Sequence, residues 1–244
     1  MIDLVRFGTD YGGFYYPRDL PGLCKESIIY CVGVGEDISH DIGISGALKG
    51  ADLYLFDPTP RAIAHVKKVQ NVQETGVRPA NNKREGGGDP TYWDRVLNTS
   101  AGPCGEIHFV PCAMDVENQE RLFYPPKNTE FVSCRFWDQG AKGDPYTVQC
   151  KTLQSIMGEN GHDRVDLLKL DIEGAEIDVL NALLDDTVPE NLPVYLSVDF
   201  DSARVGINGG AKAARALLNR LSTHYDVLKD SNWDVSFVLR STKK

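Results

Sequence analysis

Residues 163–184 constrain the fold more than any other stretch, because they combine a buried strand, a tight turn and a helix. Their sequence is DRVDLLKLDIEGAEIDVLNALL. Residues 165–172 have apolar residues on both faces, interrupted by Lys169 and by Asp166 and Asp171 near the two ends. Such a run is typical of a central strand of a parallel sheet that is covered on both sides. The apolar residues that follow recur at helical spacing. The stretch therefore predicts an α/β fold in which an acidic turn follows a central strand.

Two acidic residues, Asp171 and Glu173, lie at the carboxyl end of this predicted strand. Open α/β sheets bind their ligands at the carboxyl ends of strands, so both residues are candidates for a functional site. A carboxylate at the end of a buried strand is costly unless it is paired or used in chemistry. Glu176 falls in the first helical turn, where a carboxylate stabilises the helix dipole by about 0.3–1 kcal/mol. We interpret Asp171 as functional and Glu176 as structural.

The rest of the chain alternates between strand and helix patterns, which predicts a parallel sheet with right-handed crossovers. Thr59 and Pro60 fit the N-cap and first position of a helix. Two strand patterns at 225–228 and 235–239 are separated by a short turn and predict a hairpin, which adds an antiparallel strand. The other expected strands are 27–32, 53–56, 107–110, 147–151 and 194–198. The other expected helices are 38–48, 60–71, 211–222 and one that Thr152 caps and that runs to about residue 158.

Three segments interrupt this alternation within what we expect to be a single domain over residues 1–244. Residues 1–26 contain Tyr11-Gly12-Gly13 among aromatic residues and predict a lid segment. Residues 74–105 predict a loop insertion with one helical turn around 92–97. The loop 125–146 is rich in proline, glycine and aromatic residues, including Trp137.

Charge and composition narrow the class of partner and the location. The net charge of −9 argues against an electrostatic interaction with nucleic acid. The chain has no apolar stretch long enough to span a membrane, and residues 1–10 lack the apolar core of a signal peptide. The six cysteines include no C-x-x-C pair, so zinc is not indicated and free thiols in a reducing compartment are expected. We therefore expect a cytoplasmic protein.

The first expected strand runs into Gly33-Val34-Gly35, and the second ends at Asp57. Glycines allow a ligand to approach the backbone, and an acid after the second strand can accept hydrogen bonds from ribose hydroxyls. This pattern serves any adenosine cofactor.

Two details separate the adenosine cofactors. A dinucleotide site needs a small residue at the position that Ile38 occupies. Glu36 and Asp37 stand at the helix entry, where they would repel a pyrophosphate. An acidic entry favours a ligand with positive charge, such as S-adenosylmethionine. A nicotinamide-dependent oxidoreductase and a non-catalytic binding protein of the same fold remain the alternatives.

Several runs together resemble the FkbM family of S-adenosylmethionine-dependent methyltransferases. The central run VDLLKLDIEGAEIDVL resembles the family signature, and CVGVGEDISHDI and LYLFDPTP resemble its first and second cofactor motifs. The opening YGGFYYP is similar to a segment found ahead of the fold in some members. The resemblance implies a class I methyltransferase (Rossmann-like) fold with helices on both faces. Its seven-stranded, mostly parallel sheet has the order 3-2-1-4-5-7-6, with strand seven antiparallel.

The resemblance also implies methyl transfer from S-adenosylmethionine to a hydroxyl, with sugars among the acceptors of the family. We therefore predict an O-methyltransferase that acts on a carbohydrate, either a glycan or a small sugar. By position, the glycine run would line the methionine end, Asp57 would hold the ribose, and Ala113 and Met114 would border the adenine. The full set of predicted cofactor contacts is Gly33, Val34, Gly35, Glu36, Asp57, Pro58, Thr59, Ala113, Met114 and Asp171.

The sequence departs from the family at two places. An acid often stands near the end of the first strand, where this chain has Cys31, and the fifth strand often ends in Glu-Phe-His, where this chain has Asp-Phe-Asp at 199–201. A base borrowed from that histidine is therefore not expected here.

In the implied strand order, strands four and five are neighbours, so four acids should meet at one rim: Asp171, Glu173, Asp199 and Asp201. Crowded carboxylates raise one another's pKa, so one of them can act as a general base. We expect Asp171 in this role, with Glu173 second. The same oxygens could instead hold Mg²⁺ or Mn²⁺. The predicted acceptor contacts are Tyr11, Trp137, Asp199 and Asp201.

Overall fold

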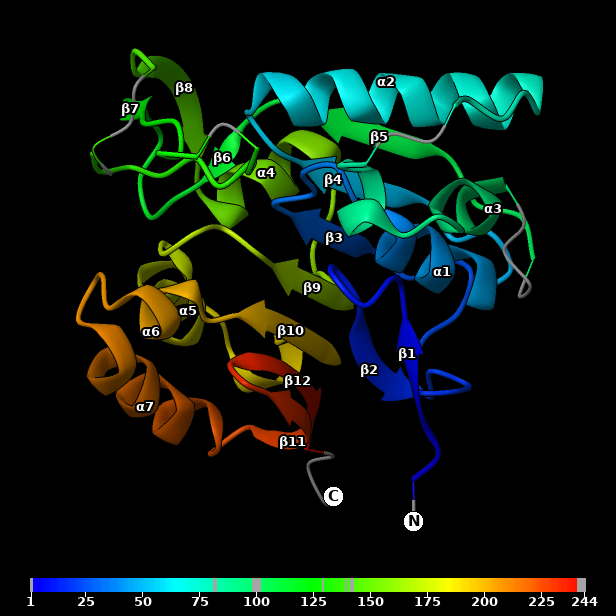
Figure 1. Ribbon diagram of the computed structural model, residues 1–244. Helices are drawn as coiled ribbons and strands as arrows, with labels where there is room; N and C mark the ends of the chain where they lie inside the picture. Colours follow the sequence, from blue (N-terminus) through cyan, green and yellow to red (C-terminus); the bar gives the residue numbers. More distant parts are fainter. Residues whose placement is uncertain are drawn as a thin grey trace.

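The fold was analysed in a computed structural model that describes residues 2–80, 83–97, 102–128, 130–138, 140 and 143–240. A seven-stranded sheet runs through its centre (Figure 1). Its strands lie in the order β5 (Ile107–Val110), β4 (Leu53–Phe56), β3 (Ile29–Val32), β9 (Leu167–Leu170), β10 (Tyr195–Asp199), β12 (Asp234–Leu239) and β11 (Tyr225–Ser231).

The pairing confirms the predicted topology. β5, β4, β3, β9 and β10 are parallel, and β12 lies antiparallel between β10 and β11. The order is therefore 3-2-1-4-5-7-6, with the C-terminal hairpin that the sequence predicts. All four residues of β9 are buried, as expected for a strand covered on both faces.

Helices cover both faces of the sheet with separate apolar clusters. One face packs against α4 (Leu153–Asn160), α5 (Glu176–Asp186) and α7 (Gly210–Leu221). The other face packs against α1 (Ser39–Ala47), α2 (Pro60–Thr75) and α3 (Tyr92–Leu97). Of the helices that the structure describes, none is long and apolar enough to cross a membrane.

The predicted cap of α2 is confirmed, and the helix is one turn longer than predicted. The Thr59 hydroxyl accepts a hydrogen bond from the Ala62 N–H at 3.3 Å, and Pro60 occupies the first turn. The helix ends at Thr75 because Gly76 follows in the left-handed conformation, with a φ of 67°.

The N-terminal segment contributes to the core as well as to the cavity. β1 (Leu4–Phe7) and β2 (Phe14–Pro17) form a hairpin, and β2 lies beside β12 (Figure 1). The fully buried Tyr16 hydroxyl lies 2.6 Å from Ser197 Oγ of β10. Only the turn between the two strands, around Tyr11, reaches the cavity described below. A lid role for residues 1–26 stays a prediction.

The described part of the 74–105 insertion is packed rather than loose. It contains the 3₁₀ turn η1 (Glu85–Gly88) and α3, which confirms the helical turn predicted at 92–97. Glu85 is buried and accepts hydrogen bonds from Lys68 Nζ at 2.7 Å and Trp93 Nε1 at 3.1 Å. The insertion is therefore joined to α2 by a partly buried ion pair.

A second, three-stranded sheet lies beside the carboxyl ends of the main sheet and was not predicted. Its strands are β6 (Ala113–Met114), β8 (Tyr146–Lys151) and β7 (Gln119–Phe123), in that order. Phe123, Cys134 and Phe136 belong to its small apolar cluster. The remaining short elements are η2 (Pro189–Asn191) and α6 (Asp201–Val205). All six cysteines are free, and four of them are buried.

Candidate active site

A cavity of about 540 Å³ opens where β3, β4, β9 and β10 end. This volume lies in the range of small-molecule sites, about 300–1,000 Å³. All ten residues predicted to contact the cofactor line it, as do Tyr11, Glu173, Asp199 and Asp201. Trp137 does not line it. The cavity is thus formed at the sheet edge where ligands bind in open α/β folds.

The first wall is the turn after β3, and it requires glycine. Gly33 has a φ of 75°, and a Cβ atom at this position would overlap the carbonyl oxygen of Asp171. The Gly33 N–H donates to the Phe56 carbonyl at 2.8 Å, and Lys169 Nζ donates to the Gly33 carbonyl at 3.1 Å. The turn is therefore fixed from both neighbouring strands, with its backbone facing the cavity.

The second wall is Asp57 at the end of β4. Its Oδ2 accepts the Gly35 N–H at 2.9 Å, and its Oδ1 accepts the Thr59 N–H and hydroxyl at 2.8 and 2.6 Å. A carboxylate has about four acceptor sites, so one remains for a ligand. Burial raises the pKa of Asp57, and these hydrogen bonds oppose that shift. A ribose that engages Asp57 with both hydroxyls must displace one of these contacts.

The acids at the helix entry are largely balanced within the protein. Glu36 forms an ion pair with Arg61, whose Nε lies 3.1 Å from Glu36 Oε1. Asp37 accepts hydrogen bonds from the Thr9 hydroxyl and, at 2.9 Å, from the Ser39 N–H. Both residues line the cavity, but less negative charge is free at this entry than the sequence indicates.

Asp171 stands apart from the other acids of the rim. Within the part of the chain that the structure describes, its carboxylate has no hydrogen-bond or ion-pair partner. Burial raises the pKa of Asp171 to about 7, while the nearby Lys169 ammonium opposes the shift and the charge of Glu173 adds to it. Asp171 is therefore poised to exchange a proton near neutral pH.

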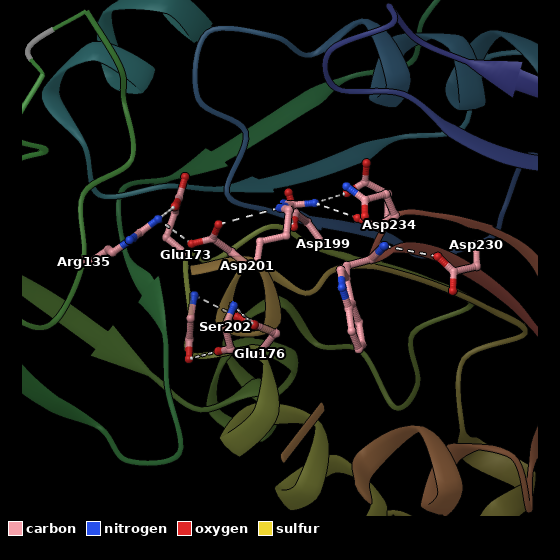
Figure 2. Close-up of polar contacts among 12 residues, drawn as sticks. Arg135, Glu173, Glu176, Asp199, Asp201, Ser202, Asp230 and Asp234 are labelled. Carbon is pink, nitrogen blue, oxygen red and sulfur yellow. Dashed lines mark hydrogen bonds and ion pairs between the residues drawn. The ribbon is translucent and has the colours of Figure 1, made fainter. Parts of the chain in front are cut away.

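Glu173 is held in an uncommon backbone conformation, with a φ of 56°. Its Oε2 accepts hydrogen bonds from Arg135 Nε at 3.3 Å and Nη2 at 3.0 Å. Arg135 Nη2 also donates to Asp201 Oδ2 at 2.5 Å, so one guanidinium joins two carboxylates (Figure 2). Burial, and then the charge of Asp201, raises the pKa of Glu173 to about 7.

A second arginine joins the acids on the other side of the rim. Arg204 of α6 pairs with Asp199, and its Nη1 donates to Asp234 Oδ1 at 2.8 Å. Its Nε lies 3.9 Å from Asp201 Oδ1. The four predicted acids do meet at one rim, but the sequence analysis missed the two arginines that separate them. The cluster of acids itself indicated that positively charged side chains would lie beside it, because buried carboxylates require compensating charge.

This pairing does not fit a site for Mg²⁺ or Mn²⁺. A hard cation needs several free carboxylate oxygens, and the guanidiniums already bind one oxygen each of Glu173, Asp199 and Asp201 and place positive charge at the rim.

Among the described residues, one group of three side chains, Cys31, His40 and Asp41, has ligand atoms within 4.8 Å of one another. That group is buried away from the cavity lining, and the charge of Lys169 lowers the pKa of Asp41 against its burial. Lys169 thus supplies the positive charge that a metal ion would bring.

Two further predicted residues have structural contacts. Trp137 packs against Gly174, where a Cβ atom would overlap its ring, and its Nε1 is buried without a hydrogen-bond partner in the described residues. Glu176 is fully buried and accepts the N–H groups of Gly174 and Ser202, both at 2.8 Å. Figure 2 shows Glu176 beside Ser202, away from Arg135. Its interpretation as a structural residue is confirmed.

Comparisons with known proteins agree with this fold. A solved structure of methyltransferase FkbM from Methylobacillus flagellatus KT superposes with a TM-score of 0.51 at 11% sequence identity, over 92% of this chain and 46% of that one. AMB antimetabolite synthetase AmbE from Pseudomonas aeruginosa is 30% identical over 94 residues, which are 38% of this chain and 4% of AmbE. The chain thus spans less than half the length of either protein. The sequence model of the methyltransferase FkbM domain matches residues 27–221, and the chain therefore belongs to the FkbM methyltransferase family.

Proposed function

We propose that the protein is an S-adenosylmethionine-dependent O-methyltransferase whose acceptor is a carbohydrate hydroxyl. The observation that carries the proposal is the unpaired Asp171 carboxylate, which lies in the same cavity as the Gly33–Gly35 turn and Asp57. Methyl transfer to a hydroxyl needs a site for the cofactor and a base for the hydroxyl proton. This cavity combines a backbone turn and an acid after the second strand, which suit the cofactor, with a carboxylate that is free to act as the base.

The cofactor would occupy the part of the cavity lined by the ends of β3 and β4. There the backbone of the Gly33–Gly35 turn would border its methionine end, Asp57 would accept from the ribose, and Ala113 and Met114 would border the adenine. S-adenosylmethionine supplies an activated methyl group on a sulfonium when it is bound. The protein aligns the acceptor with that group and excludes water.

The acceptor would lie toward the rim formed by β9, β10 and α6. As the acceptor oxygen forms its bond to the methyl carbon, the bond between that carbon and the sulfonium sulfur would break, S-adenosylhomocysteine would be the leaving group, and the hydroxyl proton would pass to Asp171. A general base of this kind contributes about 10²–10⁴ in rate. Glu173 is the second candidate, but its ion pair with Arg135 leaves it less available.

A sugar ring fits the outer part of the cavity. Tyr11 and Phe131 line it and are 61% and 57% exposed, so their rings can cover the apolar face of a sugar. Asp199 and Asp201 supply acceptor oxygens for ring hydroxyls.

Calorimetric titration with S-adenosylmethionine, S-adenosylhomocysteine and NAD⁺ tests the cofactor. We expect micromolar binding of the two sulfur ligands, no binding of NAD⁺, and no change when Mg²⁺ or Mn²⁺ is added. Turnover is then measured with neutral sugars and glycans. Binding of NAD⁺ alone would overturn the proposal, and cofactor binding without turnover on any acceptor would indicate a non-catalytic protein of the same fold.

A further inference from the structure

Residues 130–136, here called the strap, cross the cavity above the glycine turn. Phe131, Val132 and Cys134 all line the cavity. A Cβ atom on Gly35 would lie 3.4 Å from Val132 Cγ2, so the strap rests on the turn that faces the cofactor site. The strap thus forms the part of the cavity wall that lies over the glycine turn.

An arginine fastens each end of the strap. At one end Arg61 Nη1 donates to the carbonyls of Phe131 at 2.8 Å and Glu130 at 3.2 Å, while the same guanidinium pairs with Glu36. At the other end Arg135 exchanges backbone hydrogen bonds with Tyr124, at 2.7 and 3.0 Å. The backbone of Arg135 is thus held beside β7. Its side chain bridges the gap from there to Glu173 in the turn after β9 and to Asp201 of α6.

The side chain of Arg135 spans that gap and meets two carboxylates in a mostly buried place. The side chains of Arg135 and Asp201 are 12% and 10% exposed. Without the guanidinium, Glu173 and Asp201 would face each other as like charges with little water between them. One of them would then take up a proton, and either could compete with Asp171 for the acceptor proton.

From these contacts we propose that Arg135 is a positioning residue of the methyltransferase site. It pairs with Glu173 and Asp201 and so opposes their uptake of a proton, which favours Asp171, the carboxylate without such a partner, as the group that accepts the proton. The same contacts hold the strap over the cavity. The role of Asp171 in this scheme rests on the proposed function. The ion pairing and the strap closure do not, and they can be measured separately.

Many other charged or titratable side chains surround Glu173 and Asp201. From β9 and the turn after it come Lys169 and Asp171, and from the strap and the N-terminal turn come Cys134 and Tyr11. The remaining groups are Glu176 of α5, Asp199 of β10, Arg204 of α6 and Asp234 of β12. Arg204 is paired mainly with Asp199 and Asp234, so it cannot replace Arg135 at Glu173.

The first test is a carboxyl ¹³C NMR titration of the ligand-free protein, compared between wild type and Arg135→Gln. We expect the midpoints of Glu173 and Asp201 to rise by about one pH unit, a tenfold gain in proton affinity. Arg135→Lys keeps the charge but cannot bridge two carboxylates in the same way, so it should give a smaller rise. Midpoints that stay at their wild-type values in both variants would overturn the proposal, whatever the reaction.

The second test follows the strap through the dissociation rate of S-adenosylhomocysteine. We expect Arg135→Gln to release this ligand about tenfold faster. Arg220→Gln is the matched control, because Arg220 pairs with Asp185 and Asn181 between α7 and α5, outside the cavity lining. Equal dissociation rates in the wild type and Arg135→Gln would refute the strap closure. If the wild type does not bind S-adenosylhomocysteine at all, the proposed function fails while the NMR test still decides the role of Arg135.

Discussion

The two halves of the cavity are built by different means. In the proposed cofactor half, the Gly33–Gly35 turn and Asp57 line the cavity with backbone groups and a carboxylate fixed by backbone N–H donors. In the proposed acceptor half, the surface consists of side chains, and two arginines join acids from the ends of three strands. The first half is therefore rigid and depends on the chain path, whereas the second depends on charge balance. Mutations should affect the two halves differently.

The largest effect is expected from Gly33→Ala in the cofactor half. The new methyl group would overlap the Asp171 carbonyl in a left-handed conformation, so we expect a loss of about 3–5 kcal/mol of stability and no cofactor binding. Urea unfolding and titration with S-adenosylhomocysteine measure both. Gly76→Ala is the matched control, because Gly76 has a φ of 67° but no heavy atom within 4 Å of the added carbon. If both variants lose about 1 kcal/mol, the close approach at Gly33 does not matter.

In the acceptor half, Asp171→Asn should remove turnover while preserving the cofactor site. We expect a loss of about 10²–10⁴ in kcat, because the base is removed, with little change in the dissociation constant of S-adenosylmethionine. Glu173→Gln should reduce kcat less, since Glu173 is already paired with Arg135. Calorimetry and initial rates with the best acceptor from the screen measure the two effects. Unchanged turnover in Asp171→Asn would eliminate Asp171 as the base.

The same contrast explains what could be predicted from the sequence. Several contacts of the proposed cofactor half lie within one motif, such as that of Thr59 with Asp57, two positions apart, or join two successive strand ends, such as that of Gly35 with Asp57. Strand, turn and cap patterns describe such contacts, so all ten predicted cofactor residues line the cavity. The contacts of Arg135 with Glu173 and Asp201 span 38 and 66 positions. No local pattern contains such a pair, because it depends on how loops meet above the sheet.

The elements that were missed have the same cause. β6 has two residues and β7 has five, whereas their partner β8 agrees with the strand expected at 147–151. β1 and β2 have four residues each. None of the missed strands is followed by a helical pattern, whereas β9, which also has four residues, was clear from its apolar run and from the pattern of α5 after it. Trp137 was predicted at the acceptor because of its residue type, but its packing on Gly174 could not be inferred from spacing.

The dependence of activity on pH should reflect the ionisation of Asp171 in the acceptor half, and not a change in the cofactor half. Burial raises the pKa of Asp171 to about 7, and a base acts in its deprotonated form. The rate should therefore rise about tenfold per pH unit below 7 and become constant above about 8, because the fraction of ionised Asp171 follows that curve. The dissociation constant of S-adenosylhomocysteine should change much less over the same range. A rate that is flat between pH 5 and 8 would contradict the assignment of a buried carboxylate as the base.

The smallest expected effect separates helix capping from cofactor binding. Thr59 and Thr152 both cap helices, since Thr59 Oγ1 accepts from Ala62 N and Thr152 Oγ1 accepts from Ser155 N. Replacing either with alanine should cost about 1 kcal/mol of stability. Only Thr59 also donates to Asp57, at 2.6 Å, so Thr59→Ala should in addition weaken S-adenosylhomocysteine binding about fivefold through a less oriented carboxylate. Equal cofactor affinity in the two variants would show that the backbone donors of Gly35 and Thr59 suffice to hold Asp57, and would make the cofactor half depend on the chain path even more strictly.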